Sequence, residues 1–135
     1  MIEAAECFHP EHEIFYCGLD PFEGRSSADG PGVTLKMAHR LLKTTGARVQ
    51  LIPGPPCHTL ARMANNLGQI DVMVLSSRLD PKELADAWFY VPRLLHEDSD
   101  VFLECVLPGP KTVVRRLSRT EIEAKITPTD LRRAA

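Results

Sequence analysis

Four short apolar segments constrain the fold of this chain more than any other feature. They occupy residues 14–19, 49–52, 70–75 and 101–106. Their length and nearly continuous apolar character are typical of strands that are covered on both faces. The segments between them carry apolar residues at helical spacing, and this alternation favours a parallel sheet flanked by helices. We therefore predict an α/β fold, a three-layer α/β/α sandwich with a mostly parallel, Rossmann-like sheet in which the four strands are neighbours.

The first connecting segment is predicted to form an amphipathic helix. The helix should begin after residues 31–32, and Gly46 is a candidate for its C-cap because glycine often ends helices. Its apolar side chains fall on one face, whereas Lys36, Arg40 and Lys43 fall elsewhere.

The second and third helices are predicted from apolar residues that recur at helical spacing. These residues are Leu60, Met63, Ala64 and Leu67 in the second helix, and Leu84, Trp88, Val91 and Leu95 in the third. The second helix should close at Gly68, and the third should begin at Asp80 as its N-cap. Pro92 should kink or shorten the third helix near Trp88, because its ring collides with the preceding helical turn.

The two ends of the chain are predicted to be less regular. We expect residues 1–13 to form an irregular arm and residues 127–135 to be frayed. Residues 112–117 are β-branched and could form a further strand, and a capping-box pattern predicts a short helix over 119–126. The length prior favours a single domain over residues 1–135.

Size and charge narrow the class of protein. The chain has 135 residues, which is enough to bury a core, and 16 Lys+Arg against 18 Asp+Glu leave a net charge of −2. We therefore expect no nucleic-acid partner bound through a basic surface. No apolar run approaches the ~20 residues of a membrane span, and residues 1–6 lack the basic start of a signal peptide. We expect a cytoplasmic protein with no membrane partner and with free thiols.

Candidate functional residues follow the predicted strands, because ligands of open α/β sheets bind at the carboxyl ends of strands. Those ends carry Asp20 and the loops at 24–32, 53–56 and 76–80. Asp20 and Glu23 could bind ribose hydroxyls or a cation, or Asp20 could simply hold the turn before Pro21. The glycine-rich loop at 24–32 matches neither common phosphate-binding pattern, and we favour its interpretation as an ordinary loop.

Cysteine and histidine residues offer two further candidates. Cys57 and His58 lie at a predicted helix N-terminus, where a thiolate is stabilised, but no third group orients them. Cys7, His9 and His12, joined by Cys57 and His58, could supply zinc ligands. Their spacing matches no common zinc module, so we predict no metal site and an arm with solvent-exposed histidines.

Three positions share a pattern with a known family. The first predicted strand is followed by the acidic residue Asp20. Gly54 follows the second strand, and Asp71 lies at the start of the third. Over residues 14–106 this order resembles the middle and later part of a class I S-adenosylmethionine-dependent methyltransferase domain. The resemblance implies a Rossmann-like fold and S-adenosylmethionine as cofactor, with Asp20 near its ribose and Gly54 near its adenine.

The resemblance does not extend to the family's glycine-rich motif. The family's first strand and glycine-rich loop would precede residue 14, where this chain has no glycine, and no acid accompanies Gly54. Glycine lets the backbone approach the cofactor closely. We therefore expect a reduced domain with a degenerate site and weak or no binding of S-adenosylmethionine. Alternatively, residues 14–19 are the central first strand of a flavodoxin-like or Rossmann-like sheet, with loop 24–32 at the phosphate-binding position.

Three classes of function fit these observations. The first is a relative of the methyltransferases, either active or inactive. The second is a binding or interaction module that has lost the cofactor site. The third is a small-molecule enzyme with an unrelated site at the same strand ends. The missing glycine-rich loop favours the binding module. An open edge at strand 14–19, together with the aromatic residues at 88–90, leads us to expect a homodimer. The alternative is a monomer in which residues 112–117 fill the sheet.

Overall fold

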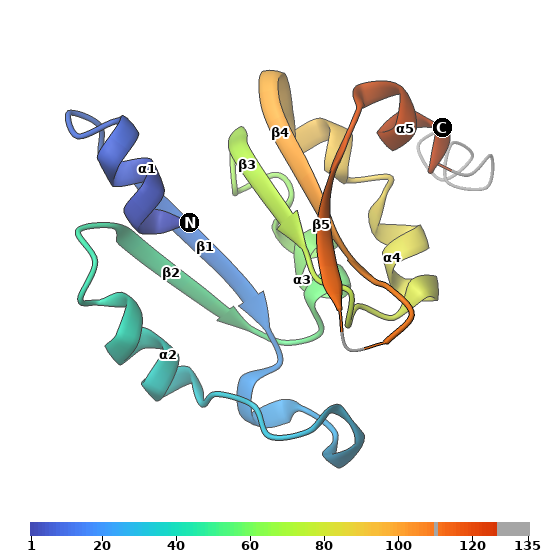
Figure 1. The fold of residues 1–135 in the computed structure, drawn as a ribbon, viewed down its shortest axis with the longest axis horizontal. Helices are drawn as coiled ribbons and strands as arrows, with labels where there is room; N and C mark the ends of the chain where they lie inside the picture. The colour runs from blue at the N-terminus through green and yellow to red at the C-terminus, as the bar shows by residue number, and fades with distance from the viewer. Residues whose placement is uncertain (110, 127–135) are drawn as a thin grey trace. The chain divides into compact units, whose positions relative to one another are not determined.

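The computed structural model of the chain describes residues 1–109 and 111–126, so the tail predicted at 127–135 lies outside it. Over the described residues the protein is a mixed α/β protein with two small sheets that are partly parallel. The chain divides into two compact units, Met1–Thr59 and Leu60–Ala135, each with one sheet (Figure 1). The strands form two separate sheets, so the structure does not show the single Rossmann-like sheet that we predicted from the sequence.

The first unit contains a two-stranded parallel sheet. Strands β1 (Phe15–Asp20) and β2 (Arg48–Pro53) pair along their whole length. The chain between them forms two short 3₁₀ turns, η1 (Phe22–Gly24) and η2 (Ser27–Asp29), and then helix α2 (Leu35–Leu42). Helix α3 (Pro56–Met63) begins soon after β2. Because the strands are parallel, their carboxyl ends lie together, and these ends carry the predicted site residues (Figure 1).

Helix α1 (Ile2–Phe8) lies within the segment predicted to be an irregular arm, and that prediction was wrong for these residues. Alanine and glutamate are strong helix formers and supply much of the segment, and the helix buries Ile2. The helix ends at Phe8 because His9 precedes a proline, which disfavours the helical conformation; His9 has a φ of −133°.

Helix α2 begins after residues 31–32, as predicted, but ends before the predicted C-cap. Thr34 is its N-cap, and the Thr34 hydroxyl oxygen accepts a hydrogen bond from the Met37 N–H at 3.1 Å. The helix ends at Leu42, so Gly46 is not its C-cap. The hydroxyls of Thr44 and Thr45 donate to the carbonyls of Leu41 and Leu42 at 2.7 and 2.6 Å. These side chains satisfy the last carbonyls, which removes the need for a glycine cap.

The second unit contains a mixed three-stranded sheet. Strand β3 (Ile70–Leu75) pairs in parallel with β4 (Leu95–Val106), and β4 pairs in antiparallel with β5 (Thr112–Leu117). Helix α4 (Pro81–Ala87) and the 3₁₀ turn η3 (Val91–Leu94) connect β3 to β4, and α5 (Arg119–Ala124) follows β5 (Figure 1). Residues 112–117 therefore form a strand.

Strand positions were predicted more accurately than strand environments. The predicted boundaries of β1, β2 and β3 agree within one residue. On β3, however, Val72 and Val74 are 47% and 50% exposed, whereas Met73 and Leu75 are buried. This alternation is typical of a strand with one covered face. The apolar run alone could not distinguish the two cases because valine is common on both kinds of strand.

Strand β4 starts at Leu95, a residue predicted to lie on the third helix. Asp80 is the N-cap of α4 as predicted, and Pro92 shortens that helix, which ends at Ala87. The chain then forms η3 and enters β4 with an irregularity. Ile70 pairs with Leu95 but Val72 pairs with Asp100, so residues 96–99 of β4 lie opposite the single residue Asp71 and form a bulge.

The core of the second unit is centred on η3 and β4. Val91, Leu94 and Val101 are completely buried, and Trp88 and Ile122 are nearly so. Burying each valine or leucine side chain stabilises the fold by about 1.5–3 kcal/mol relative to exposure. The end of α4, its following turn and α5 are therefore held by one apolar cluster.

Helix α5 begins with the predicted capping box. The Ser118 hydroxyl oxygen accepts the Glu121 N–H at 3.2 Å, and the Glu121 carboxylate accepts the Ser118 N–H at 2.8 Å. This backbone hydrogen bond and an ion pair with Arg115 lower the pKa of Glu121 to about 2. Because the folded pKa lies below the usual value of 4.5, the contacts stabilise the fold above pH 4.5 and are lost as the pH falls towards 2.

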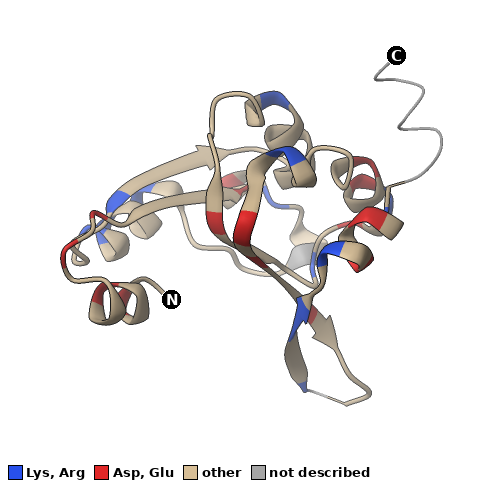
Figure 2. Cartoon of the chain, turned by 90° about the horizontal axis from the view of Figure 1, so that it is seen from above, with Lys and Arg blue, Asp and Glu red and all other residues tan. Residues whose placement is uncertain are grey.

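Charged residues of both signs occur in both units (Figure 2). No helix among the described residues is long and apolar enough to cross a membrane.

Candidate functional site

The parallel pairing of β1 and β2 brings the two predicted cofactor-binding residues together. Asp20 ends β1, and Gly54 follows β2 directly. The Gly54 N–H donates to the Asp20 main-chain carbonyl at 3.1 Å. A candidate site therefore exists at the carboxyl ends of these strands. What it can bind depends on which polar side chains there lack a hydrogen-bond partner within the protein.

The Asp20 carboxylate is occupied by two residues of its own loop. One oxygen accepts the Phe22 N–H at 2.7 Å and the Arg25 Nε–H at 3.3 Å, and the other forms an ion pair with Arg25. Phe22 is buried and has a φ of 48°, in the left-handed region that costs a non-glycine residue free energy. The hydrogen bond from its N–H helps to hold Phe22 in this conformation.

Glu23 accepts a hydrogen bond from the backbone at the start of α2. Its carboxylate accepts the N–H of Leu35, the first residue of the helix, at 3.0 Å. In Rossmann-like folds a ligand phosphate occupies this kind of position, where free N–H groups attract an anion. Here a glutamate of the same chain supplies the anion. Asp20 and Glu23 are thus engaged separately.

The glycines near this site serve local packing. A Cβ at Gly32 would lie 2.6 Å from the Arg25 Cδ, so the absence of a side chain lets Arg25 pass towards Asp20. Gly54 has a φ of +137°, and a Cβ there would lie 2.9 Å from the Thr59 hydroxyl. Both glycines therefore have structural roles that need no ligand.

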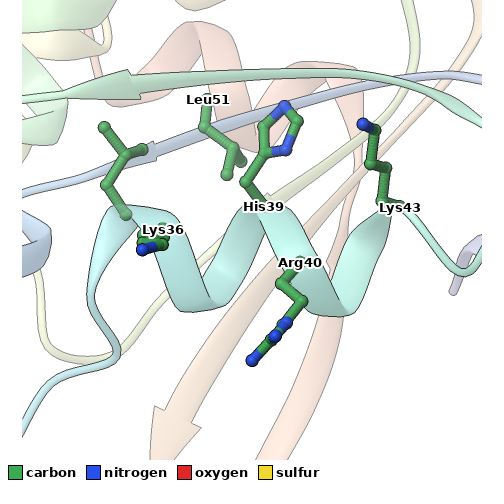
Figure 3. Close-up of a pocket in the computed structure, with 6 residues that line it drawn as sticks. Lys36, His39, Arg40, Lys43 and Leu51 are labelled. Atoms are coloured by element: carbon green, nitrogen blue, oxygen red, sulfur yellow. The ribbon is translucent and has the colours of Figure 1, made fainter.

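A basic groove between α2 and β2 was not predicted as a site. It has a volume of about 510 Å³, and its lining residues are Leu35, Lys36, His39, Arg40, Lys43 and Leu51. Figure 3 shows Leu51 extending from β2 towards the helix, with His39 and Lys43 directed towards the strand and Arg40 on the opposite side. Within the described residues, no hydrogen bond or ion pair engages these four basic side chains.

The sequence contains a signal for this groove, but the three basic residues were noted only as lying off the apolar face of the predicted helix. Lys36, Arg40 and Lys43 recur at spacings of four and three, which places them along one side of a helix. The missing information was the course of β2, because Leu51 of that strand lines the groove across from the helix.

Cys57 and His58 lie near the start of α3, but they face different surroundings. Cys57 is 6% exposed and His58 is exposed. Neighbouring residues of a helix point in different directions, and here one side chain is buried and the other exposed. Cys7 is exposed on α1, and it does not belong to the cluster of potential metal ligands among the described residues, which contains His9, Glu11 and His12.

The loop after β3 is held by Glu104 of β4. One Glu104 oxygen accepts hydrogen bonds from the Ser76 hydroxyl, the Ser77 N–H and the Ser77 hydroxyl at 2.9–3.1 Å. The backbone hydrogen bond from Ser77, followed by the two hydroxyls, lowers the pKa of Glu104. Asp80 is engaged as the N-cap of α4. The polar groups of this loop, like those after β1, serve local structure.

Asp71 pairs with His96, which the sequence analysis did not single out. The His96 Nε2 lies 2.9 Å from an Asp71 carboxylate oxygen, and the Asp98 N–H donates to Nδ1 at 3.2 Å. The Ser99 hydroxyl donates to the Ile70 carbonyl and accepts the His96 N–H. Ser99 is thus bonded to backbone groups and not to the imidazole, so these residues form no serine–histidine–aspartate relay.

The aromatic residues at 88–90 are mostly covered. Trp88 is buried, and Phe89 and Tyr90 are half-buried. The Arg93 guanidinium lies 4.4 Å from the Phe89 ring centroid, and the Lys125 ammonium lies 5.2 Å from that of Trp88. These contacts favour a role in the core over a docking patch.

No protein-family model, curated protein or solved structure matches this chain. The functional interpretation therefore depends on the geometry of the candidate sites.

We expect Asp20→Ala to lower the free energy of unfolding by about 1–3 kcal/mol, because it leaves the Phe22 N–H without its acceptor and removes the Arg25 pair. Asp20→Asn keeps an oxygen that can accept the Phe22 N–H, so it should cost less. Urea unfolding followed by circular dichroism measures both. Equal losses would show that the charge, and not the accepted hydrogen bond, is what matters.

Proposed function

We propose that this protein is a binding module whose ligand is an amphipathic organic anion held in the groove between α2 and β2. One observation carries the proposal: Lys36, His39, Arg40 and Lys43 line a groove whose apolar residues are Leu35 and Leu51, and these basic side chains have no partner among the described residues. Basic side chains gathered around leucines suit a molecule with an apolar body and a carboxylate, phosphate or sulfonate group.

The electrostatics of the groove favour weak, salt-sensitive binding. The protein carries a net charge of −2, yet three of the six groove residues are lysine or arginine. Each contact between exposed charges contributes about 0.2–1 kcal/mol, and physiological salt screens charges beyond about 8 Å. The apolar part of the ligand must therefore supply much of the affinity, by covering Leu35 and Leu51.

We expect anilinonaphthalene sulfonate, a fluorescent amphipathic anion, to bind with a saturable rise in fluorescence. Its uncharged relative phenylnaphthylamine should bind more weakly. The double variant Lys36→Gln/Lys43→Gln should weaken sulfonate binding by about two- to thirtyfold, because two charge contacts are lost.

Lys82→Gln is the matched control, because Lys82 is an exposed lysine on α4, outside the groove. Raising the salt concentration should weaken binding to the wild-type protein and to Lys82→Gln alike. If the double variant binds the sulfonate as tightly as Lys82→Gln does, the groove is not the binding site.

We further propose that the resemblance to S-adenosylmethionine-dependent methyltransferases reflects a scaffold without a working cofactor site. The parallel pairs β1–β2 and β3–β4 are the units from which a Rossmann-like sheet is built, and a single such sheet is part of this proposal. The support for a degenerate site is that Arg25 and the Phe22 N–H occupy the Asp20 carboxylate and that Glu23 takes the place of a bound anion at α2. An active methyltransferase, or another small-molecule enzyme using these strand ends, is the alternative.

Calorimetric titration with S-adenosylmethionine and S-adenosylhomocysteine tests this proposal. We expect no saturable heat at micromolar ligand, because the ribose-binding carboxylate is engaged within the chain. Micromolar binding that Asp20→Ala abolishes and Lys82→Gln leaves unchanged would support the methyltransferase instead.

We also propose that the chain forms a homodimer through an open sheet edge, and that this edge is β5 instead of the strand at 14–19 that the sequence suggested. Among the described residues β5 is bonded only to β4 in its sheet, and its Val113 and Val114 are 41% and 62% exposed. The charges of Arg115 and Arg116, which would otherwise discourage pairing, are neutralised by Glu121 and Asp100.

Sedimentation equilibrium at micromolar concentration should give a mass near twice 15.0 kDa. Val114→Lys should shift the equilibrium towards the monomer, because it places an unpaired charge on the edge strand. Val33→Lys, at an exposed valine outside the strands, is the control. A single 15.0 kDa species at all concentrations would exclude the dimer.

A further inference from the structure

The turn after α1 brings three potential metal ligands together. His9, Glu11 and His12 each offer one ligand atom, and these atoms all lie within 4.8 Å of one another. The two imidazole rings have centroids 5.8 Å apart and are inclined by 31°. All three side chains are exposed, so solvent and ions can reach them.

The backbone holds this arrangement at the end of the helix. The His9 N–H donates to the Ala5 carbonyl at 2.9 Å, which fixes His9 as the C-cap of α1. The His12 N–H then donates to the His9 carbonyl at 3.1 Å and closes a turn around Pro10. The two histidines are therefore brought to one side by hydrogen bonds of the main chain, and only side-chain rotation remains to be fixed.

Two imidazoles and one carboxylate are a donor set suited to Zn²⁺. Zinc bonds to nitrogen and oxygen are about 2.0–2.2 Å long, so neighbouring ligand atoms of a tetrahedral site lie about 3.4 Å apart. The side chains would need to approach one another by at most about 1.4 Å from the present limit of 4.8 Å. Exposed side chains can rotate that far without disturbing a core.

We propose that His9, Glu11 and His12 bind a zinc-like divalent cation. Three protein ligands leave a fourth position for water, so the site is open and exchangeable. This site is separate from the groove residues, and it would stand if the proposed anion binding failed.

The proposal differs from the zinc ligands considered in the sequence analysis. There Cys7 accompanied the two histidines, and Cys57 and His58 completed the set. Among the described residues the cluster contains Glu11 and none of those three. Cys7 lies in the last turn of α1, whereas both histidines follow the end of that helix.

Calorimetric titration of the full chain with Zn²⁺ tests the proposal. We expect one site, and we expect His9→Ala, Glu11→Gln and His12→Ala each to weaken binding by about tenfold or more, as loss of a ligand from a three-ligand site should. Cys7→Ser and His58→Ala are matched controls that should leave the affinity unchanged, because they lie outside the cluster.

Co²⁺ gives a second readout, because its visible absorption reports the kind of ligand. The wild-type protein should develop visible ligand-field bands without the near-ultraviolet charge-transfer band of a cobalt–thiolate bond, and His12→Ala should lose them. The proposal is overturned if Zn²⁺ affinity is unchanged in His12→Ala and Glu11→Gln. It is also overturned if Cys7→Ser or His58→Ala reduces the affinity as much as those variants do.

Discussion

The hydrogen bonds of the Asp20 carboxylate organise the end of the first sheet. Asp20 holds the buried Phe22 in a left-handed conformation and keeps Arg25 across the loop, while Gly54 approaches its carbonyl from β2. Glu23, in the same loop, caps the backbone at the start of α2. One short segment thus fixes how the chain leaves β1 and how it enters the helix that lines the groove. The same contacts engage the carboxylates of both Asp20 and Glu23 with groups of their own unit.

Sequence patterns were sufficient where the structure is decided locally. The Asp80 N-cap, the effect of Pro92 and the Ser118–Glu121 capping box each depend on residues within a few positions of one another, and all three are present. Gly46 failed as a cap because Thr44 and Thr45 satisfy the same carbonyls by another route. Leu95 was assigned to a helix because its spacing from Val91 fits one, but the strand pairing with Ile70 decided its conformation.

The candidate sites depend on contacts that no local pattern contains. The proximity of Asp20 and Gly54 follows from parallel strand order, and the sequence analysis could anticipate it. The groove requires Leu51 to face a helix nine residues earlier in the chain, and the ligand cluster at His9 requires a helix end that was not predicted. Arg25 as the partner of Asp20 was likewise invisible, because a loop of unknown course separates them.

The bulge at residues 96–99 separates a single strand pair from a continuous stretch of pairing between β3 and β4. Ile70 meets Leu95 on one side, and Val72 to Leu75 meet Asp100 to Leu103 on the other. The Ser99 hydroxyl donates to the Ile70 carbonyl and accepts the His96 N–H, so the two ends of the bulge are joined to each other and to β3. The pairing of Val72–Leu75 with Asp100–Leu103 lies beyond the bulge. Substitutions within residues 96–99 can therefore change the surface there without moving a side chain from one face of the sheet to the other. A surface of new specificity could arise there while the core beneath it stays the same.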